Sequence, residues 1–311
     1  MSDDTVKQEL YSSIGEDPHT FDNPEIAHVT INENKVLASN TVPGLSVDIR
    51  ELPDGIDLRM ELEENRVIQY PVHMCFGVIP RTGVQRINLD VVIGKNSKIS
   101  LMAHCSFPFA VDVKHIMDAK IKVMDGAEYS YFERHVHSET GGVNVLPKAV
   151  VDVGRGARFR TEFQLLKGRV GIMDIDYETH VAEEGLVEMT ALVSGSGDDH
   201  IVLHETAFLE GASSRAVLTS KVAVRNNARS EVFNKIVALA PYARGHVDCK
   251  EIIKDNGVAV ATPIVDVRDA HAHVTHEAAI GSVDKKQLET LMSRGMDEDE
   301  ASEVIIQGLL S

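Results

Sequence analysis

Three histidines and a glutamate lie close together near the C-terminal end of the 311-residue chain, in the stretch DAHAHVTHEAAIG at residues 269 to 281. A zinc enzyme would use three converging imidazoles with an open coordination position. In a strand, however, His271 and His273 would point to one face and His276 to the other. A metal-dependent enzyme with this histidine-rich site is therefore one interpretation, and an ordinary polar strand end is the other.

The chain has three cysteines, Cys75, Cys105 and Cys249, which are far apart and odd in number. They form no disulfide framework and no local CxxC metal motif, so we interpret them as free thiols, Cys75 as a buried one. His135 and His137, in ERHVHSE, share a strand face. We interpret these two histidines as surface or hydrogen-bonded strand residues and not as ligands.

The charge balance restricts the partners of the protein. Forty-eight acidic and 31 basic side chains give a formal net charge of -17, which repels phosphate backbones and anionic membrane surfaces. We therefore expect neither a nucleic acid nor a membrane as partner. The N-terminus MSDDTVKQEL is acidic where a secretory signal would be basic and then apolar. These features predict a cytoplasmic protein, and the 43% hydrophobic content is enough for a core.

Short alternating runs rich in Val, Ile, Thr and Ala fill the chain from about residue 85 to 280. Turn residues separate them and recur about every fifteen residues, as in MDGAEYS, GRGARFR, LEGASSR and DNGVAVA. A fixed period of this kind is typical of a β-helix, in which each coil buries its inward face by stacking on its neighbours. An antiparallel sandwich, which also has closely spaced turns, is the alternative.

A coil of a β-helix returns the chain to nearly the same place. Residues about 27 positions apart can therefore be neighbours on stacked coils, which would bring Cys249 to His276 and Glu277. A thiolate, an imidazole and a carboxylate form a ligand set that suits iron. Two such sets related by a two-fold axis could hold a cluster that neither protomer holds alone.

The ends of the chain differ from this repeat, so we expect three segments: a flexible acidic leader over 1–20, a β-helix core over 21–280 and two helices over 281–311. Gly295 would end the first helix, and Asp297 and Glu300 would form a capping box for the second. The apolar faces of the two helices either cap the solenoid or dock another protein, and they carry Leu288, Leu291, Met292, Val304 and Ile305.

The stretch YARGHVDCKEII contains an AR-x-x-x-x-C run that ends at Cys249, and HEA follows at residues 276–278. With these motifs, residues 85–311 resemble the SufB/SufD family of iron–sulfur cluster assembly proteins. The later RG pair is Arg294 and Gly295. Upstream, SKISLMAHCSFP resembles the family strand in which a cysteine precedes a proline, which places Cys105 there.

The resemblance implies a mainly β protein with a right-handed parallel β-helix core and a short C-terminal helical domain. It also implies a scaffold, and not an enzyme, that holds a transient iron–sulfur cluster and docks a SufC-like ABC-type ATPase on the C-terminal helices. By position, the cluster-binding residues would be Cys249, His276 and Glu277, and Cys105 would accept sulfur from a donor protein of unknown identity. Because both landmarks occur on one chain, we expect a homodimer.

The chain departs from the family pattern in two places. The N-terminal helical region of longer members is mostly absent, and AVATP, Ala259 to Pro263, stands where SufB-type sequences have a histidine. The chain also has no GxxxxGK[ST] loop. We therefore expect no directly bound nucleotide, and any ATP dependence would come from a partner.

Overall fold

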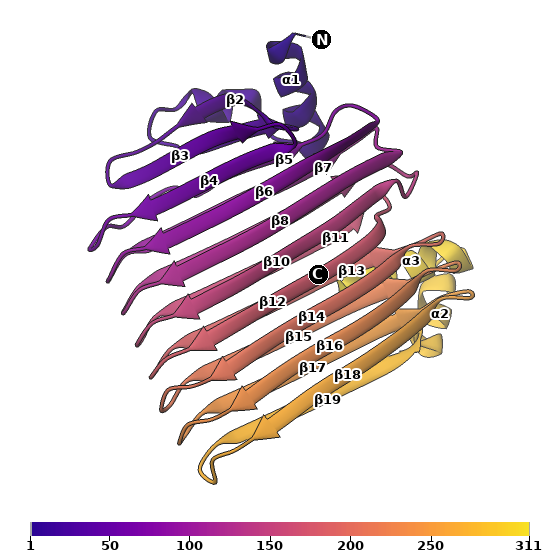
Figure 1. Cartoon of the computed structure of the whole chain (residues 1–311). Helices are drawn as coiled ribbons and strands as arrows, with labels where there is room; N and C mark the ends of the chain where they lie inside the picture. The colour runs from indigo at the N-terminus through magenta and orange to yellow at the C-terminus, as the bar shows by residue number, and fades with distance from the viewer. Residues whose placement is uncertain (1, 311) are drawn as a thin grey trace.

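The computed structural model describes residues 2–310 and shows a parallel β-solenoid of about eight turns (Figure 1). Each coil adds one strand to each of two sheets. The ten-stranded sheet has the order β19 (His273–Ser282), β17 (Arg244–Ile253), β15 (Arg215–Val224), β13 (Leu186–Gly195), β11 (Arg158–Lys167), β9 (Glu128–His137), β7 (Lys98–Phe107), β5 (Val72–Gly77), β1 (His28–Asn32) and β2 (Lys35–Asn40). The nine-stranded sheet has the order β18 (Val258–Val267), β16 (Arg229–Ala238), β14 (His200–Leu209), β12 (Gly171–Val181), β10 (Val143–Val153), β8 (Asp112–Val123), β6 (Thr82–Ile93), β4 (Gly55–Leu62) and β3 (Leu45–Leu52).

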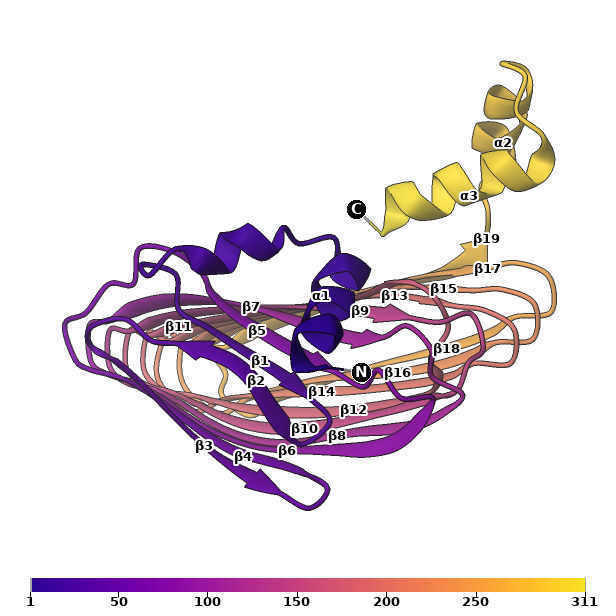
Figure 2. The same cartoon turned by 90° about the horizontal axis from the view of Figure 1, so that it is seen from above.

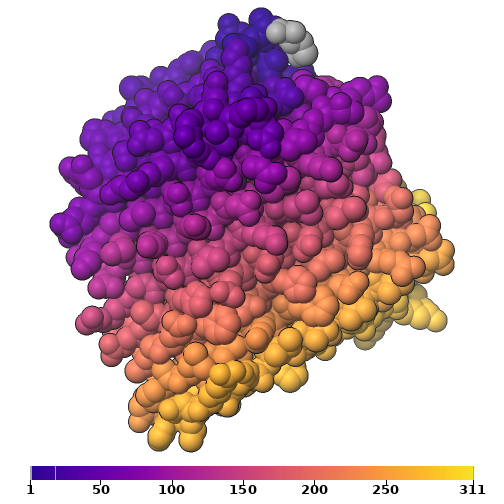
Figure 3. All heavy atoms as spheres, viewed as in Figure 1, coloured from indigo at the N-terminus to yellow at the C-terminus, as the bar shows by residue number. Residues whose placement is uncertain are grey.

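The mainly β prediction and the β-helix prediction are confirmed. Only β2 and β3, at the N-terminal end, pair antiparallel with their neighbours β1 and β4. All other pairings of the named strands are parallel. Equivalent residues are one coil apart: Leu186 pairs with Arg215, and Arg215 pairs with Arg244 on the next coil. The fifteen-residue spacing of the turns is thus half a coil. This parallel pairing excludes the antiparallel sandwich, and in Figure 3 the colour changes steadily along the solenoid from the N-terminal to the C-terminal end.

Strict alternation along each strand builds the core between the two sheets. In β14, for example, every second residue from Ile201 to Leu209 is buried, Glu205 among them, while the residues between them are partly exposed. Successive side chains of a strand point to opposite faces, so the buried set faces inward and stacks on the equivalent set of the next coil. The apolar ladders that result form one continuous core along the solenoid.

One corner of the solenoid is a column of residues with left-handed backbone. Each of them comes two positions before a strand of the ten-stranded sheet, and φ is positive at Asn96, Gly126, Gly156, Glu184, Ser213 and Tyr242. The turn motifs in the sequence therefore mark the corners correctly. In LEGASSR and DNGVAVA, however, the left-handed residues are Ser213 and Asp255 and not the glycines.

The N-terminal segment contains two short helices. Helix α1 (Asp3–Ile14) buries Leu10 and Tyr11 against the outer face of the ten-stranded sheet, and the short 3-10 helix η1 (Pro18–Asp22) follows it. The Tyr11 hydroxyl lies 2.7 Å from Thr30 Oγ1. Cys75 is buried under this helix, as predicted. The division of the chain into three segments stays a prediction.

The two expected C-terminal helices are present as α2 (Lys285–Met292) and α3 (Glu298–Leu309). The predicted capping box of Asp297 and Glu300 is confirmed. Ile306 packs on the outer face of β15 and β17, so the helices lie beside the solenoid and leave its last coil open (Figure 2). Within residues 2–310, none of the helices has the length and apolar character to cross a membrane.

Polar side chains interrupt the apolar interior at a few positions. Glu205 of β14 is 3% exposed, and burial raises the pKa of its carboxyl to about 8. Its Oε2 atom has no hydrogen-bond partner among the described residues. A carboxyl in such surroundings is neutral near pH 7 because ionisation without a compensating partner is costly.

Close stacking of the coils predicts a strong effect of Gly211→Ala. A Cβ atom at Gly211 would lie 1.9 Å from the backbone nitrogen of Glu183, on the preceding coil. We expect the free energy of unfolding, measured by urea denaturation, to fall by about 1–3 kcal/mol. Gly281→Ala is the control, because a Cβ there meets nothing within 4 Å. Equal stability of both variants would contradict the observed coil contact.

The raised pKa of the Glu205 carboxyl predicts that the stability of the protein depends on pH. Because its folded pKa of about 8 lies above the ordinary value of 4.5, the unfolded state ionises first and stability is lost as pH rises between these values. We expect the free energy of unfolding of Glu205→Gln, relative to that of the wild type, to rise by about 3 kcal/mol from pH 5 to pH 8. Urea denaturation across this range measures the difference, and a pH-independent difference would show that Glu205 is ionised in the fold.

Candidate functional site

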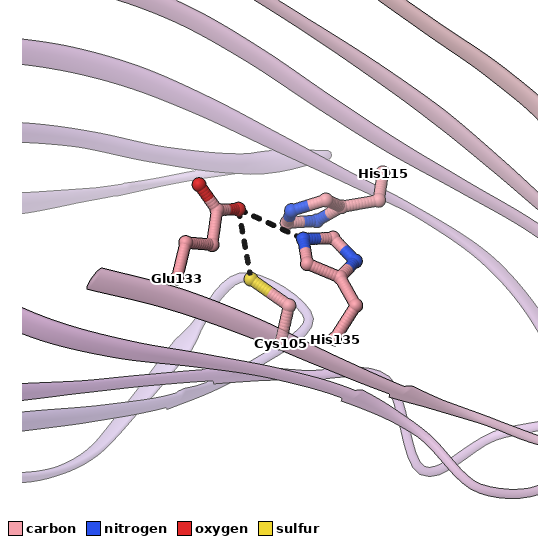
Figure 4. A group of neighbouring side chains, drawn as sticks. All are labelled: Cys105, His115, Glu133 and His135. Atoms are coloured by element: carbon pink, nitrogen blue, oxygen red, sulfur yellow. Dashed lines mark hydrogen bonds and ion pairs between the residues drawn. The ribbon is translucent and has the colours of Figure 1, made fainter. Parts of the chain in front are cut away.

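Cys105 lies inside the solenoid in a closed cluster of four side chains (Figure 4). It faces inward from β7, and its Cα partner on the next coil is His135 of β9. Glu133 Oε1 lies 3.6 Å from Cys105 Sγ and 2.8 Å from His135 Nε2. His115 approaches from β8 in the other sheet. The possible ligand atoms of these four buried residues lie within 4.8 Å of one another.

The surroundings of this cluster determine its charges. Burial, together with the charge of Glu133, raises the pKa of the Cys105 thiol well above its ordinary range. Burial also acts to raise the pKa of Glu133, but hydrogen bonding and charge at His135 outweigh it, and the net shift is downward. Burial lowers the pKa of His115 to about 3. Cys105 is therefore a neutral thiol beside an ionised carboxylate, in contrast to the low-pKa cysteine that a nucleophile needs.

The sequence interpretation of the neighbouring histidines was only partly correct. His135 and His137 share a strand face and are hydrogen-bonded, as expected, but both are buried and neither lies on the surface. Glu133 and His115 were not singled out at all. Glu133 follows Cys105 by 28 residues and His135 follows it by 30, so one full coil of the solenoid was the signal that could have identified them.

The second candidate site lies at the open C-terminal end of the solenoid. Cys249 faces inward from β17 and is fully buried. Its Cα partner on β19 is Ala278, 29 residues later. Asn234 Nδ2 lies 3.8 Å from the Cys249 sulfur and 3.4 Å from Ser220 Oγ. The cysteine is therefore covered by the last coil and surrounded by small polar groups.

The register separates the three residues expected at the cluster site. His276 pairs with Val247 and faces inward like Cys249, and it is exposed because no further coil covers it. Glu277 pairs with Asp248 and points to the outer face. The structure thus places Cys249 and His276 on one face, two positions apart along the strands, and places Glu277 on the other. The three do not form a group of neighbouring ligand atoms among the described residues.

Polar groups at this end have shifted pKa values. Burial raises the pKa of Cys249, and a hydrogen bond with Ser220 partly opposes the shift. Glu251, two residues later on the same inner face, has a pKa raised to about 7 by burial, and its Oε2 accepts a hydrogen bond from Ser230 at 3.4 Å. Glu251 and Asn234 are thus inward polar neighbours of Cys249 that the sequence interpretation did not identify.

The three histidines of the stretch at residues 269–281 do not converge on one point. His273 lies on the outer face of β19 and His276 on the inner face, while His271 belongs to the preceding turn. The described residues contain one other possible ligand group besides the Cys105 cluster. It consists of Glu16, His73 and His104, near the N-terminal segment.

The C-terminal helices carry an exposed groove. Leu291, Val304 and Ile305 line it together with Ile252 at the edge of the solenoid. Met292 and Val304 are 41% and 43% exposed, and Leu288 is half-buried. These are the residues expected to dock a partner, and all of them are at least partly exposed. Val304 and Ile305 belong to α3 itself, whose Ile306 packs on the sheet.

Comparisons with known proteins identify relatives of this chain. Residues 81–309 match the family model described as SUF system FeS cluster assembly, SufBD core domain. An iron-sulfur cluster assembly SufBD family protein of Methanocaldococcus jannaschii is 36% identical over 98% of this chain and 99% of its own length. A protein of the same family from Pyrococcus horikoshii is 35% identical over 97% of this chain and 92% of its own length.

A shorter match is with a bacterial protein. The iron-sulfur cluster assembly protein SufB of Bacillus subtilis is 36% identical over 69 residues, which are 22% of this chain and 15% of that protein. The family model and the long archaeal matches cover the β-solenoid and the C-terminal helices together. The chain therefore belongs to the SufBD family of iron–sulfur cluster assembly proteins.

Proposed function

We propose that this protein is a non-enzymatic scaffold that holds a nascent iron–sulfur cluster at the open end of its solenoid. Family membership supports a role in cluster assembly. The observation that carries the proposal is that Cys249 and His276 share the inner face of the last two coils, at the C-terminal end of the solenoid, beside which the C-terminal helices lie without covering the last coil. A thiolate and an imidazole are both iron ligands.

A second copy of the chain is the proposed cover of this end. Strands β18 and β19 are the last strands of their sheets, so within residues 2–310 one side of each has no strand partner. Apolar residues are exposed on them, among them Val260, Ile264 and Ile280. Unpaired edges and exposed apolar side chains favour pairing with another strand. A two-fold axis there would bring two Cys249 and two His276 residues together and complete a cluster site.

The proposal also sets conditions on each ligand. Cys249 is closed to solvent in the single chain, so the last coil has to open for iron to reach the sulfur. This coil is held on one side only, and such regions open at a lower free energy than the core does. Glu277 faces outward, so it joins the site only if the edge strand turns when two copies meet. A small, mixed ligand set suits a site that must release its cluster.

Cys105 remains the proposed sulfur acceptor. Its thiolate would attack the outer sulfur of a donor persulfide, break that S–S bond and leave the donor as a thiolate. Because the resting thiol is neutral, Cys105 must first lose its proton, and Glu133 Oε1, at 3.6 Å, is an acceptor within reach. The identity of the donor and the expected cytoplasmic location stay predictions.

An ABC-type ATPase of the SufC kind is the proposed second partner. The chain has no nucleotide-binding GxxxxGK[ST] loop, so nucleotide chemistry would belong to that subunit. The groove of α2 and α3 supports this docking because Leu291, Val304 and Ile305 offer an apolar surface next to acidic side chains. Apolar anchors in a groove commonly supply most of the binding energy of an interface.

Anaerobic reconstitution with ferrous iron and sulfide tests the cluster site. We expect wild-type protein to develop sulfide-to-iron charge-transfer absorption and Cys249→Ala to lose most of it, because the main sulfur ligand is gone. Cys75→Ala is the matched control, since it also removes a buried thiol but lies under α1. Equal spectra for the wild type and Cys249→Ala would overturn the assignment of the site.

The ATPase groove is tested by Val304→Asp. A charge at this 43% exposed position would have to be desolvated on docking, so we expect the dissociation constant for a SufC-like ATPase to rise at least about tenfold. Gln307→Asp, on the same helix but outside the groove, should bind as the wild type does. Titration calorimetry measures both, and unchanged binding of the Val304 variant would place the partner elsewhere.

A further inference from the structure

Hydrogen bonds determine which ring nitrogens of the closed cluster carry protons. His137 Nδ1 lies 3.2 Å from the Arg169 carbonyl oxygen, so it carries a proton and donates it. In neutral His137 the other nitrogen, Nε2, accepts, and it lies 3.1 Å from His135 Nδ1, which therefore donates. Neutral His135 is then left with an unprotonated Nε2 that faces Glu133 Oε1 at 2.8 Å. Two acceptors at this distance require a cation between them, either a proton or a metal ion.

His115 is held in the same way. Gln85 Nε2 donates to the carbonyl oxygens of Glu33 at 2.9 Å and Gly77 at 3.1 Å, so its amide oxygen is the atom that faces His115. His115 Nδ1 donates to that oxygen at 3.0 Å. The neutral ring therefore has a free lone pair on Nε2. A histidine whose other nitrogen donates to a carbonyl group in this way is the usual arrangement of a metal ligand.

The carboxylate of Glu133 has spare coordinating capacity. Its Oε2 atom is buried and has no hydrogen-bond partner among the described residues. Figure 4 shows the carboxylate, the sulfur of Cys105 and the rings of His115 and His135 converging from β7, β8 and β9. An unpartnered buried oxygen in the middle of such a group is costly unless a cation satisfies it.

We propose that Cys105, His115, Glu133 and His135 form a buried site for a single divalent transition-metal ion, Zn²⁺ or Fe²⁺. One sulfur, two imidazole nitrogens and one carboxylate oxygen make a four-ligand, tetrahedral set. The thiolate favours these ions over Mg²⁺ and Ca²⁺. A thiolate, a carboxylate and a divalent ion sum to zero charge, which a water-free interior requires.

Binding of the ion also releases protons from its ligands. The metal displaces the Cys105 thiol proton and the proton held between Glu133 and His135, so two protons leave for each ion. With metal–ligand bonds of about 2.0–2.3 Å, the ligand atoms of a tetrahedral site lie about 3.3–3.7 Å apart. The widest pairs, now within 4.8 Å, must therefore draw together, while Glu133 Oε1 and His135 Nε2, now 2.8 Å apart, must separate slightly. A metal-bound thiolate is not free to attack a persulfide, so ion and sulfur compete for Cys105.

This site is independent of the proposed cluster site. Cys249 on β17 lies five coils further along the ten-stranded sheet than Cys105 on β7, with β9, β11, β13 and β15 between them, and it is not one of the four ligands. The proposal therefore does not depend on scaffold activity. Because all four ligands are buried, we expect slow uptake, and the protein should be incubated with the ion for hours before measurement.

Cobalt(II) is the probe for this site, because its thiolate complexes absorb visibly. Metal-free, full-length protein with Co²⁺ and no iron or sulfide should bind one ion per chain, with thiolate-to-cobalt charge transfer and the strong visible bands of tetrahedral cobalt. Release of two protons per ion, measured with an indicator dye, is expected as well. Cys105→Ser should lose the charge-transfer band, whereas Cys75→Ser and Cys249→Ser, which remove the other two thiols, should retain it.

A second variant keeps the test valid if Cys105→Ser fails to fold, as judged by circular dichroism. His115→Gln leaves all three cysteines in place and should weaken Co²⁺ binding at least about tenfold. It should also abolish the rise in melting temperature that Zn²⁺ gives the wild type. No charge-transfer band in the wild type, a band that persists in Cys105→Ser, or unchanged affinity in His115→Gln would each overturn the proposal.

Discussion

The structure depends on parallel, in-register stacking of coils. A coil has no core of its own, and its inward side chains are buried only by the equivalent residues one coil before and one coil after. Cys105 therefore meets His135, and Cys249 meets Ala278, across parallel strands. By the same rule, the inward side chains of the final coil are at most partly buried, because this coil has a neighbouring coil on one side only. Both candidate sites, the closed one and the open one, follow from this single constraint.

Turn spacing was enough to predict the fold, but it was not enough to predict which side chains meet. The corners of the solenoid require left-handed residues at regular intervals, and these leave a visible period in the sequence. Contacts between coils depend on the exact length of each coil and on alternation along the strand. An offset of about 27 predicted that Cys249 meets His276 and Glu277, whereas the real partner is 29 residues away. Alternation then puts Glu277 on the opposite face.

The sequence of a single strand was also not enough to predict which polar residues lie in the interior. His135 and His137 alternate with other polar and apolar residues, which in a single sheet would be consistent with an exposed face. In a solenoid one face of every strand is core, so the odd-numbered residues of β9 are buried whatever their polarity. Helix α1 is the converse case, because Leu10 and Tyr11 find an apolar surface on β5 and β9 that the sequence of the leader does not reveal.

The two sites differ in what burial allows them to do. In the closed cluster the ligands come from three strands that are packed on both sides, so an ion held there could leave only by opening the core, which suits a resident ion. At the open end, Cys249 lies one strand from the edge, and Glu251, with a pKa near 7, can change charge close to neutral pH. A cargo that must be built and released needs such an edge, where opening one coil costs far less than unfolding the solenoid.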